Sequence, residues 1–241
     1  FCMMYPDTYE LGQANQALRI LVNVVNAVDG MVAERAFLPA AEFCDTMRAE
    51  GLPLFSIESC APVAEFDALG FTLSHELVAT NVLEALDLAG IPLHAQDRGE
   101  DDLFVIGGGP CSYNPEPYAP FFDIFSIGEG EEALPECLQA IRRLRAEGAC
   151  RADILRAIAR MDGFYVPSLY RWRDEEQAQQ AGSWIEPVEE CLPTHIQKRV
   201  FEGFAESPGW EPCIVPFTEV VQDRLNVEVL RGCARGCRFC Q

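Results

Sequence analysis

Basic residues and long apolar runs are both scarce in this sequence. Its 241 residues include 18 Lys and Arg against 38 Asp and Glu, which gives a formal net charge of −20. Nucleic-acid backbones are bound by clustered basic side chains, so this composition excludes DNA or RNA binding by the segment alone. No stretch approaches the roughly 18 uncharged apolar residues of a membrane-spanning helix, so no membrane span is expected.

Closely paired cysteines of the kind that cross-link small secreted domains are also missing. The chain has 11 cysteines, an odd number, and three of them stand together at the end of the sequence. A disulfide framework uses paired cysteines in a short secreted chain, so we expect a reducing, cytoplasmic setting with free thiols. We interpret the scattered cysteines as small buried hydrophobic residues; they are at positions 2, 44, 60, 111, 137, 150, 191 and 213.

Both ends of the chain read as interior parts of a longer protein. Phe1 is not an initiator methionine, and residues 1–4 have the apolar character of a buried strand. Gln241 directly follows a cysteine motif that should open a new structural element. We therefore expect the chain to be a segment of something longer.

The first part of the chain alternates short apolar runs with helical stretches. The apolar runs lie at residues 1–4, 32–38, 54–57, 69–73, 103–106 and 124–127. Helices are expected over residues 11–28, 40–50, 76–89 and 133–147. Unbroken apolar strands separated by helices predict a parallel sheet covered on both faces. The expected fold class is therefore α/β, a doubly wound sheet of the Rossmann or flavodoxin kind.

Loops that follow the expected strands are the candidate ligand site, because ligands of such sheets bind beyond the carboxyl ends of the strands. The three loops with unusual residues lie at 5–12, 107–117 and 128–132. Without a Cβ, glycine lets a nucleotide tail approach the sheet edge closely. The candidate glycines are Gly107, Gly108, Gly109, Gly128 and Gly130. For each loop, a tight turn without any ligand is the alternative.

The sequence changes character twice beyond this domain. Residues 150–215 predict a small α+β linker with a helix at 151–160, a strand at 163–173, a polar loop at 174–181 and an extended connector at 185–204. Farther on, Leu225, Val227 and Val229 alternate with polar residues, which predicts a half-buried strand. We therefore divide the chain into a doubly wound domain at 1–149, a linker at 150–215 and the start of a further domain at 216–241.

A cysteine motif follows this strand at once. Cys233, Cys237 and Cys240 have the spacing C-x3-C-x2-C, and three thiolates on one loop can hold three irons of a 4Fe–4S cube. The fourth iron would be left without a protein ligand. Gly232 and Gly236 allow the backbone to wrap tightly. The alternatives are three unrelated thiols or a zinc site, although structural zinc needs four ligands and no fourth lies nearby.

The motif resembles that of the radical S-adenosylmethionine superfamily, including an aromatic residue, Phe239, before the last cysteine. The resemblance implies that the open iron binds S-adenosylmethionine and that electron transfer cleaves it to methionine and a 5′-deoxyadenosyl radical. It also implies an electron donor and a substrate that the sequence does not identify. Phe239 could pack on an aromatic ring of a ligand. We expect this segment alone to be inactive, because a barrel cannot close around one strand.

A doubly wound domain directly ahead of such a loop resembles the cobalamin-binding class of radical enzymes. Residues 5–12, 71–73, 108–111 and 114–117 further resemble an uncharacterised bacterial family that joins this domain to a radical barrel. The resemblance covers the whole chain and implies cobalamin as a further cofactor. Asp7 and Tyr9 then occupy the loop in which cobalamin domains of the methionine-synthase type carry Asp-x-His-x-x-Gly.

One departure from that class concerns the cobalt ligand. Tyr9 stands where the histidine would be, and neutral tyrosine is a poor cobalt ligand, so bound cobalamin should lack a protein imidazole. For the pocket of the nucleotide tail, Thr72 and Ser74 are the nearest candidates. Three interpretations stay open: cobalamin-dependent methyl transfer, a radical enzyme whose first domain recognises a substrate or partner instead, and a non-catalytic module with a structural metal.

Overall fold

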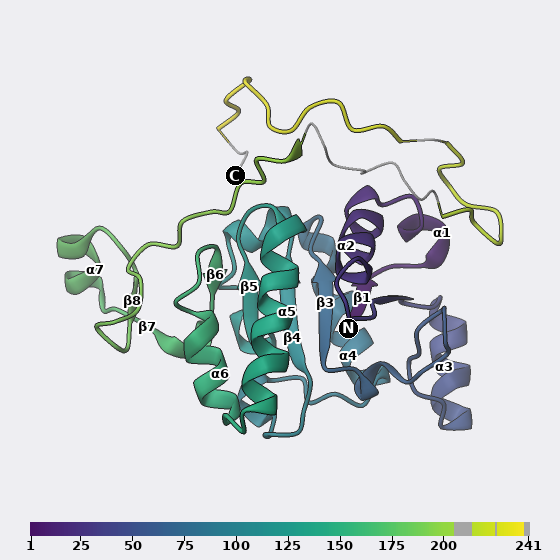
Figure 1. The fold of residues 1–241 in the computed structure, drawn as a ribbon, viewed down its shortest axis with the longest axis horizontal. Helices are drawn as coiled ribbons and strands as arrows, with labels where there is room; N and C mark the ends of the chain where they lie inside the picture. Colours follow the sequence, from purple (N-terminus) through teal and green to yellow (C-terminus); the bar gives the residue numbers. More distant parts are fainter. Residues whose placement is uncertain (205–213, 225, 239–241) are drawn as a thin grey trace.

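The computed structural model describes residues 1–204, 214–224 and 226–238, with a six-stranded sheet at its centre (Figure 1). The strands are β1 Cys2–Tyr5, β2 Glu34–Phe37, β3 Ala68–Thr72, β4 Phe104–Gly108, β5 Ile124–Ser126 and β6 Phe164–Tyr165. Their order is β2-β1-β3-β4-β5-β6, and only β6 runs antiparallel to its neighbour. The predicted doubly wound α/β fold is confirmed. The order of the first five strands is flavodoxin-like, with its switch point between β1 and β3.

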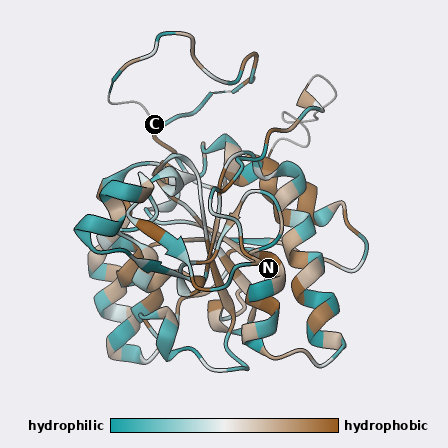
Figure 2. Ribbon diagram, turned by 90° about the vertical axis from the view of Figure 1, so that its left-hand side faces the viewer, coloured by the Kyte–Doolittle hydropathy of each residue, from teal (hydrophilic) through white to brown (hydrophobic). Residues whose placement is uncertain are grey.

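Helices cover both faces of this sheet (Figure 1). One face carries α2 Gln16–Asn26, α5 Gly130–Ala146 and α6 Arg151–Ile158, and the other carries α3 Ala41–Glu50 and α4 Ala79–Leu88. Figure 2 shows apolar strands at the centre and helices with a polar outer side. Among the described residues, no helix combines the length and the apolar character needed to cross a membrane.

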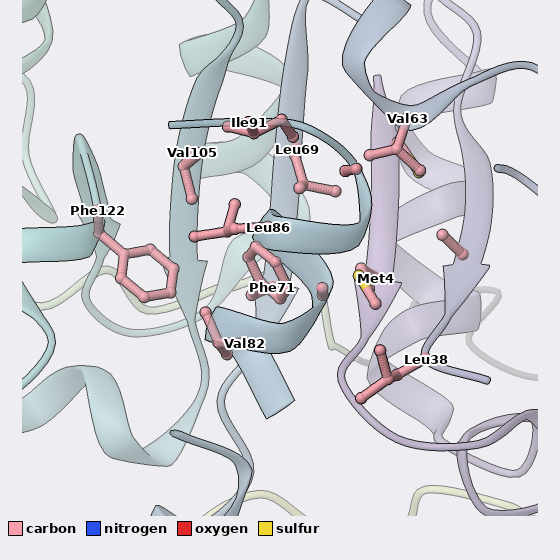
Figure 3. Close-up of a cluster of buried hydrophobic side chains, with 14 of the residues drawn as sticks. Met4, Leu38, Val63, Leu69, Phe71, Val82, Leu86, Ile91, Val105 and Phe122 are labelled. Atoms are coloured by element: carbon pink, nitrogen blue, oxygen red, sulfur yellow. The ribbon is translucent and has the colours of Figure 1, made fainter. Parts of the chain in front are cut away.

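The core on the α3–α4 face follows from the unbroken apolar strands. Met4, Phe71 and Val105 project from β1, β3 and β4 toward Val82 and Leu86 of α4 (Figure 3). All five side chains are almost completely buried. Burying each large apolar side chain contributes roughly 1.5–3 kcal/mol, which explains why these runs become central strands.

Several predicted elements differ from the structure. The helix expected over 11–28 is divided into α1 Tyr9–Gly12 and α2, which begins where the Asn15 side chain accepts the Leu18 N–H at 2.9 Å. The run at 54–57 contributes only an isolated bridge. The strand expected over 163–173 is interrupted by a turn at Pro167–Leu169, which separates β6 from β7 Tyr170–Trp172.

The prediction of a loop over 174–181 is wrong, because α7 forms there at Glu175–Ala181. The Asp174 side chain accepts the Gln177 N–H at 2.9 Å, and Gly182 ends the helix in the left-handed conformation. These helix-end signals stabilise α7 although the polar composition of the segment predicts a loop. The chain then returns as β8 Ile185–Pro187, which pairs with β7.

The segments after residue 150 pack on the doubly wound domain. Ile154 and Ile158 of α6 and Phe164 of β6 join the same core as α2 and α5. The boundary near residue 150 therefore stays a prediction.

The strand predicted near residue 227 does not form among the described residues 226–230, where Val229 is 82% exposed. A strand needs a hydrogen-bonded neighbour, and none adjoins this segment within the described residues. Leu225 lies outside the described residues.

Candidate functional site

A cavity of about 420 Å³ lies between the sheet and helices α2 and α5. It spans the switch point of the sheet, because Met3 of β1 and Gly70 of β3 both line it. From there it extends to the loops that follow β4 and β5. The glycines predicted from the sequence all line it: Gly107, Gly108, Gly109, Gly128 and Gly130. Two of the three predicted ligand loops, 107–117 and 128–132, thus meet at one place, whereas the loop at 5–12 contributes no residue to it.

Small residues on one face of the strands create this space. Strand side chains alternate, so Thr72, Gly108 and Ser126 face the cavity while neighbours such as Phe71 and Phe125 fill the opposite core. A Cβ added at Gly108 would have no described atom within 4 Å. The volume is within the range of small-molecule sites, which begins near about 300 Å³.

Three buried polar atoms of this cavity have no hydrogen-bond partner within the described part of the chain. They are Thr72 Oγ1, Ser126 Oγ and Gln16 Nε2. Buried polar groups are almost always satisfied, and leaving one unpaired costs about 1–3 kcal/mol. Two hydroxyls and an amide facing one apolar cavity are the arrangement with which proteins orient a bound small molecule.

The mouth of the cavity carries acids and one arginine. The Arg231 guanidinium donates to both carboxylate oxygens of Glu228, at 2.9 Å each, contacts Glu131 and lies 3.5 Å from Glu129. The hydrogen bonds that Arg231 donates to Glu228 and Glu131 raise the pKa of its guanidinium. Glu129 also accepts the backbone N–H of Phe201. The acids at the start of α5 are therefore already paired, which gives no support to a phosphate at that helix end.

Gly128 allows a close backbone approach at this mouth. Its φ is +107°, and an added Cβ would lie 2.6 Å from the backbone nitrogen of Arg199. Arg199 exchanges backbone hydrogen bonds with Ile127 and Glu129, at 2.9 and 3.0 Å.

Gly128→Ala is therefore expected to lower the free energy of unfolding by more than the roughly 1–3 kcal/mol that a positive φ alone costs a residue with a Cβ. Gly182→Ala is the matched control, because Gly182 also has a positive φ but no described atom within 4 Å of the added Cβ. Urea unfolding compares the two variants, and an equal loss in both would show that the contact with Arg199 is unimportant.

Asp7 and Tyr9 do not line the cavity. The Asp7 carboxylate accepts the N–H of Thr8 at 2.7 Å. The Tyr9 ring packs between Phe37 and Phe217, with centroid distances of 5.1 and 4.3 Å, and its hydroxyl accepts the Phe217 N–H at 3.2 Å. The structure thus places Tyr9 against the segment that crosses the carboxyl edge of the sheet, and both residues lie apart from the glycines that line the cavity.

The cysteine loop is described as far as residue 238. Cys233 is exposed and Cys237 half-buried, both as free thiols, while Cys240 and Phe239 lie outside the described residues. Gly232 and Gly236 have φ values of +84° and +67°, which only glycine adopts readily. The Arg235 N–H donates to Cys233 Sγ at 3.4 Å.

These features fit an iron–sulfur cluster, whose sulfurs accept backbone N–H bonds. No group of three metal-binding side chains is assembled among the described residues.

The scattered cysteines are only partly as predicted. Cys2, Cys44, Cys111 and Cys137 are buried, and burial raises the pKa of the Cys137 thiol to about 12. By contrast, the cysteines at 60, 150 and 191 are exposed, so for them the prediction of buried hydrophobic residues is wrong. Cys213 lies outside the described residues.

Sequence reasoning missed Gln16, Ser126 and Arg231 as residues of the cavity. For Ser126 a signal was available, because a small polar residue interrupts an apolar strand on the face that Gly108 and Thr72 share. For Arg231 there was none, since its partners Glu129 and Glu131, which belong to the mouth of the cavity, lie far away in sequence.

Comparison with known proteins identifies the family to which this chain belongs. The sequence profile of one family, Radical SAM proteins, N-terminal, matches residues 17–167. No curated protein matches the chain. A similar solved structure is that of the radical S-adenosylmethionine methyltransferase TsrM from Kitasatospora setae, with tryptophan substrate and a SAM analog bound.

The identity to TsrM is 16% and the TM-score 0.41, over 68% of this chain and 28% of that one. The chain thus spans little more than a quarter of that protein's length. At these values the likeness bears on neither ligand nor reaction.

Proposed function

The chain belongs to the radical SAM protein family, whose N-terminal region it matches, and we propose that it binds cobalamin in the cavity between the sheet and helices α2 and α5. Proteins of this family are enzymes that use a 4Fe–4S cluster and S-adenosylmethionine. The full-length protein would then be a cobalamin-dependent radical enzyme, and methyl transfer to an unactivated position is the reaction that this pair of cofactors suits best. Its methyl acceptor and its electron donor are not specified by the residues of this chain.

The unpaired hydroxyls inside the cavity carry this proposal. A nucleotide tail combines a planar apolar ring, which would lie against Gly108, with polar atoms that Thr72 and Ser126 could bind. Seating such a group removes the unfavourable free energy of the unpaired atoms. Tyr9 lies outside the cavity and has its hydroxyl engaged with Phe217, so it is not proposed as a cobalt ligand.

Cys233 and Cys237, together with Cys240, would hold the cluster. When bound, the cluster supplies one electron to S-adenosylmethionine. Arg235 directs its backbone N–H at the Cys233 sulfur, a bond that would stabilise the thiolate form of this ligand. Gly232 and Gly236, both at positive φ, would allow the loop to wrap around the cluster.

Filling the cavity tests the proposal. Gly108→Leu places a side chain in open space and so should leave the fold intact while occupying the ligand site. Hydroxocobalamin titration, followed by the visible spectrum, is expected to show one site in the unaltered chain and about tenfold or weaker affinity in the variant. Gly99→Leu is the matched control, because Gly99 lies outside this cavity and meets only Asp102, at 3.8 Å. Equal binding by both variants would contradict the proposal.

A second candidate is supported by the acids at the mouth. Glu129, Glu131 and Glu228 outnumber Arg231, so the opening favours a neutral or cationic ligand over a phosphate-bearing one. The domain would then recognise a substrate of the radical enzyme in place of cobalamin. Absence of any spectral change at high hydroxocobalamin concentration, with intact fold and cluster, would favour this candidate.

A further inference from the structure

Arg231 connects two parts of the molecule that are remote in sequence. Its partners Glu129 and Glu131 belong to the turn that opens α5, whereas Glu228 belongs to its own segment. That segment crosses the carboxyl edge of the sheet, where the Asn226 side chain donates to the Ala14 carbonyl at 3.1 Å (Figure 1). A single side chain therefore fastens this crossing segment to the mouth of the cavity.

The contacts of Arg231 are partly shielded from water. The Arg231 side chain is 20% exposed and that of Glu131 only 7%. The guanidinium also lies over the Phe204 ring, 5.1 Å from its centroid. Exposed ion pairs contribute little to stability, but shielded networks contribute more because water screens them less. Without Arg231, three carboxylates would face one another at the mouth, so this end of the segment would lose its attachment to α5.

The same segment borders the cavity and leads into the cysteine loop. Glu228 and Arg231 both line the cavity. Cys233 follows Arg231 by two residues, so their Cα atoms are at most about 7 Å apart. Ordering of the cysteine loop would therefore restrict one wall of the cavity, and a ligand against that wall would restrict the loop in return.

We propose that Arg231 is a positioning residue that couples ligand binding in the cavity to cluster binding on the cysteine loop. The inference rests on the proposed function, since it takes cobalamin as the cavity ligand. A cluster fixes the loop, the loop fixes the wall formed by Glu228 and Arg231, and cobalamin is then bound more tightly. Coupling of this kind is reciprocal, so bound cobalamin strengthens cluster binding by the same factor.

The coupling is measured on the chain with and without a reconstituted cluster. Hydroxocobalamin is expected to bind about fivefold or more tightly when the cluster is present, and this gain should fall below about twofold in Arg231→Gln. Arg224→Gln is the matched control: Arg224 is an exposed arginine of the same crossing segment and does not line this cavity. An undiminished gain in Arg231→Gln would overturn the inference.

Hydrogen exchange separates this inference from the proposed function. In the chain without cofactors, Arg231→Gln should speed amide exchange across residues 226–238, while exchange in β1, β3 and β4 stays as in the unaltered chain and shows that the fold is intact. Arg224→Gln should leave amide exchange unchanged both at 226–238 and in the three strands. If hydroxocobalamin fails to bind at all, the proposed ligand is wrong and exchange alone decides on Arg231. Equal exchange at 226–238 with and without the arginine would then refute its positioning role.

Discussion

Asp123→Ala is expected to lower the free energy of unfolding by about 3–5 kcal/mol. The Asp123 carboxylate pairs with Arg98 and Arg151, each at 2.9 Å, and accepts the Val105 N–H at 2.8 Å. The Arg98 side chain is completely buried, and this burial lowers its pKa although Asp123 opposes the shift. Removing the carboxylate that both arginines share would leave two buried cations without this counter-ion.

The matched control for this prediction is Asp67→Ala. Asp67 also pairs with an arginine, Arg145, but at 3.4 Å and with a side chain that is 80% exposed. Its loss should change the free energy of unfolding by no more than about 0.5 kcal/mol. Urea unfolding followed by circular dichroism measures both variants. Similar losses in the two would show that the buried triad does not hold the loop before β5 against α6.

Cys233→Ala is expected to abolish cluster binding almost completely, and so is Cys237→Ala. A 4Fe–4S cube held by three thiolates loses a third of its protein ligands in either variant. Iron and acid-labile sulfide per chain, measured after anaerobic reconstitution and gel filtration, are the appropriate readouts. This test of the cluster ligands is independent of cobalamin binding.

Cys60→Ala controls for iron bound adventitiously by surface thiols. Cys60 is exposed, as Cys233 is, but lies in a different part of the chain. It should retain the full iron content of the unaltered chain. If the Cys233 variant also retained that content, the motif would not be the cluster site and three unrelated thiols would be the better interpretation.

The fold and the glycine-lined part of the site could be predicted because both depend on local patterns. Unbroken apolar runs between amphipathic helices specify a parallel sheet, and the carboxyl ends of parallel strands meet at one edge. Gly108 and Gly128 therefore lie near each other because β4 and β5 are neighbouring strands.

The rest of the site depends on contacts that no local pattern encodes. Arg231 meets Glu131 because the crossing segment returns over the sheet, and Arg199 meets Gly128 through a single isolated bridge. The alternation near Val227 predicts a strand that does not form among the described residues 226–230, because strand formation also requires a neighbour. Tyr9 was a candidate site residue because of its place in the loop after β1, but its ring packs against the apolar residues Phe37 and Phe217.

A crystal structure of this chain grown with hydroxocobalamin is the most direct test of the cavity as the ligand site. We expect density for the nucleotide tail between the sheet and helices α2 and α5, with the hydroxyls of Thr72 and Ser126 within hydrogen-bonding distance of it. Clear density at another place, such as the cavity beside Tyr165 and Trp172, would contradict the assignment. An empty cavity at saturating ligand would contradict it as well.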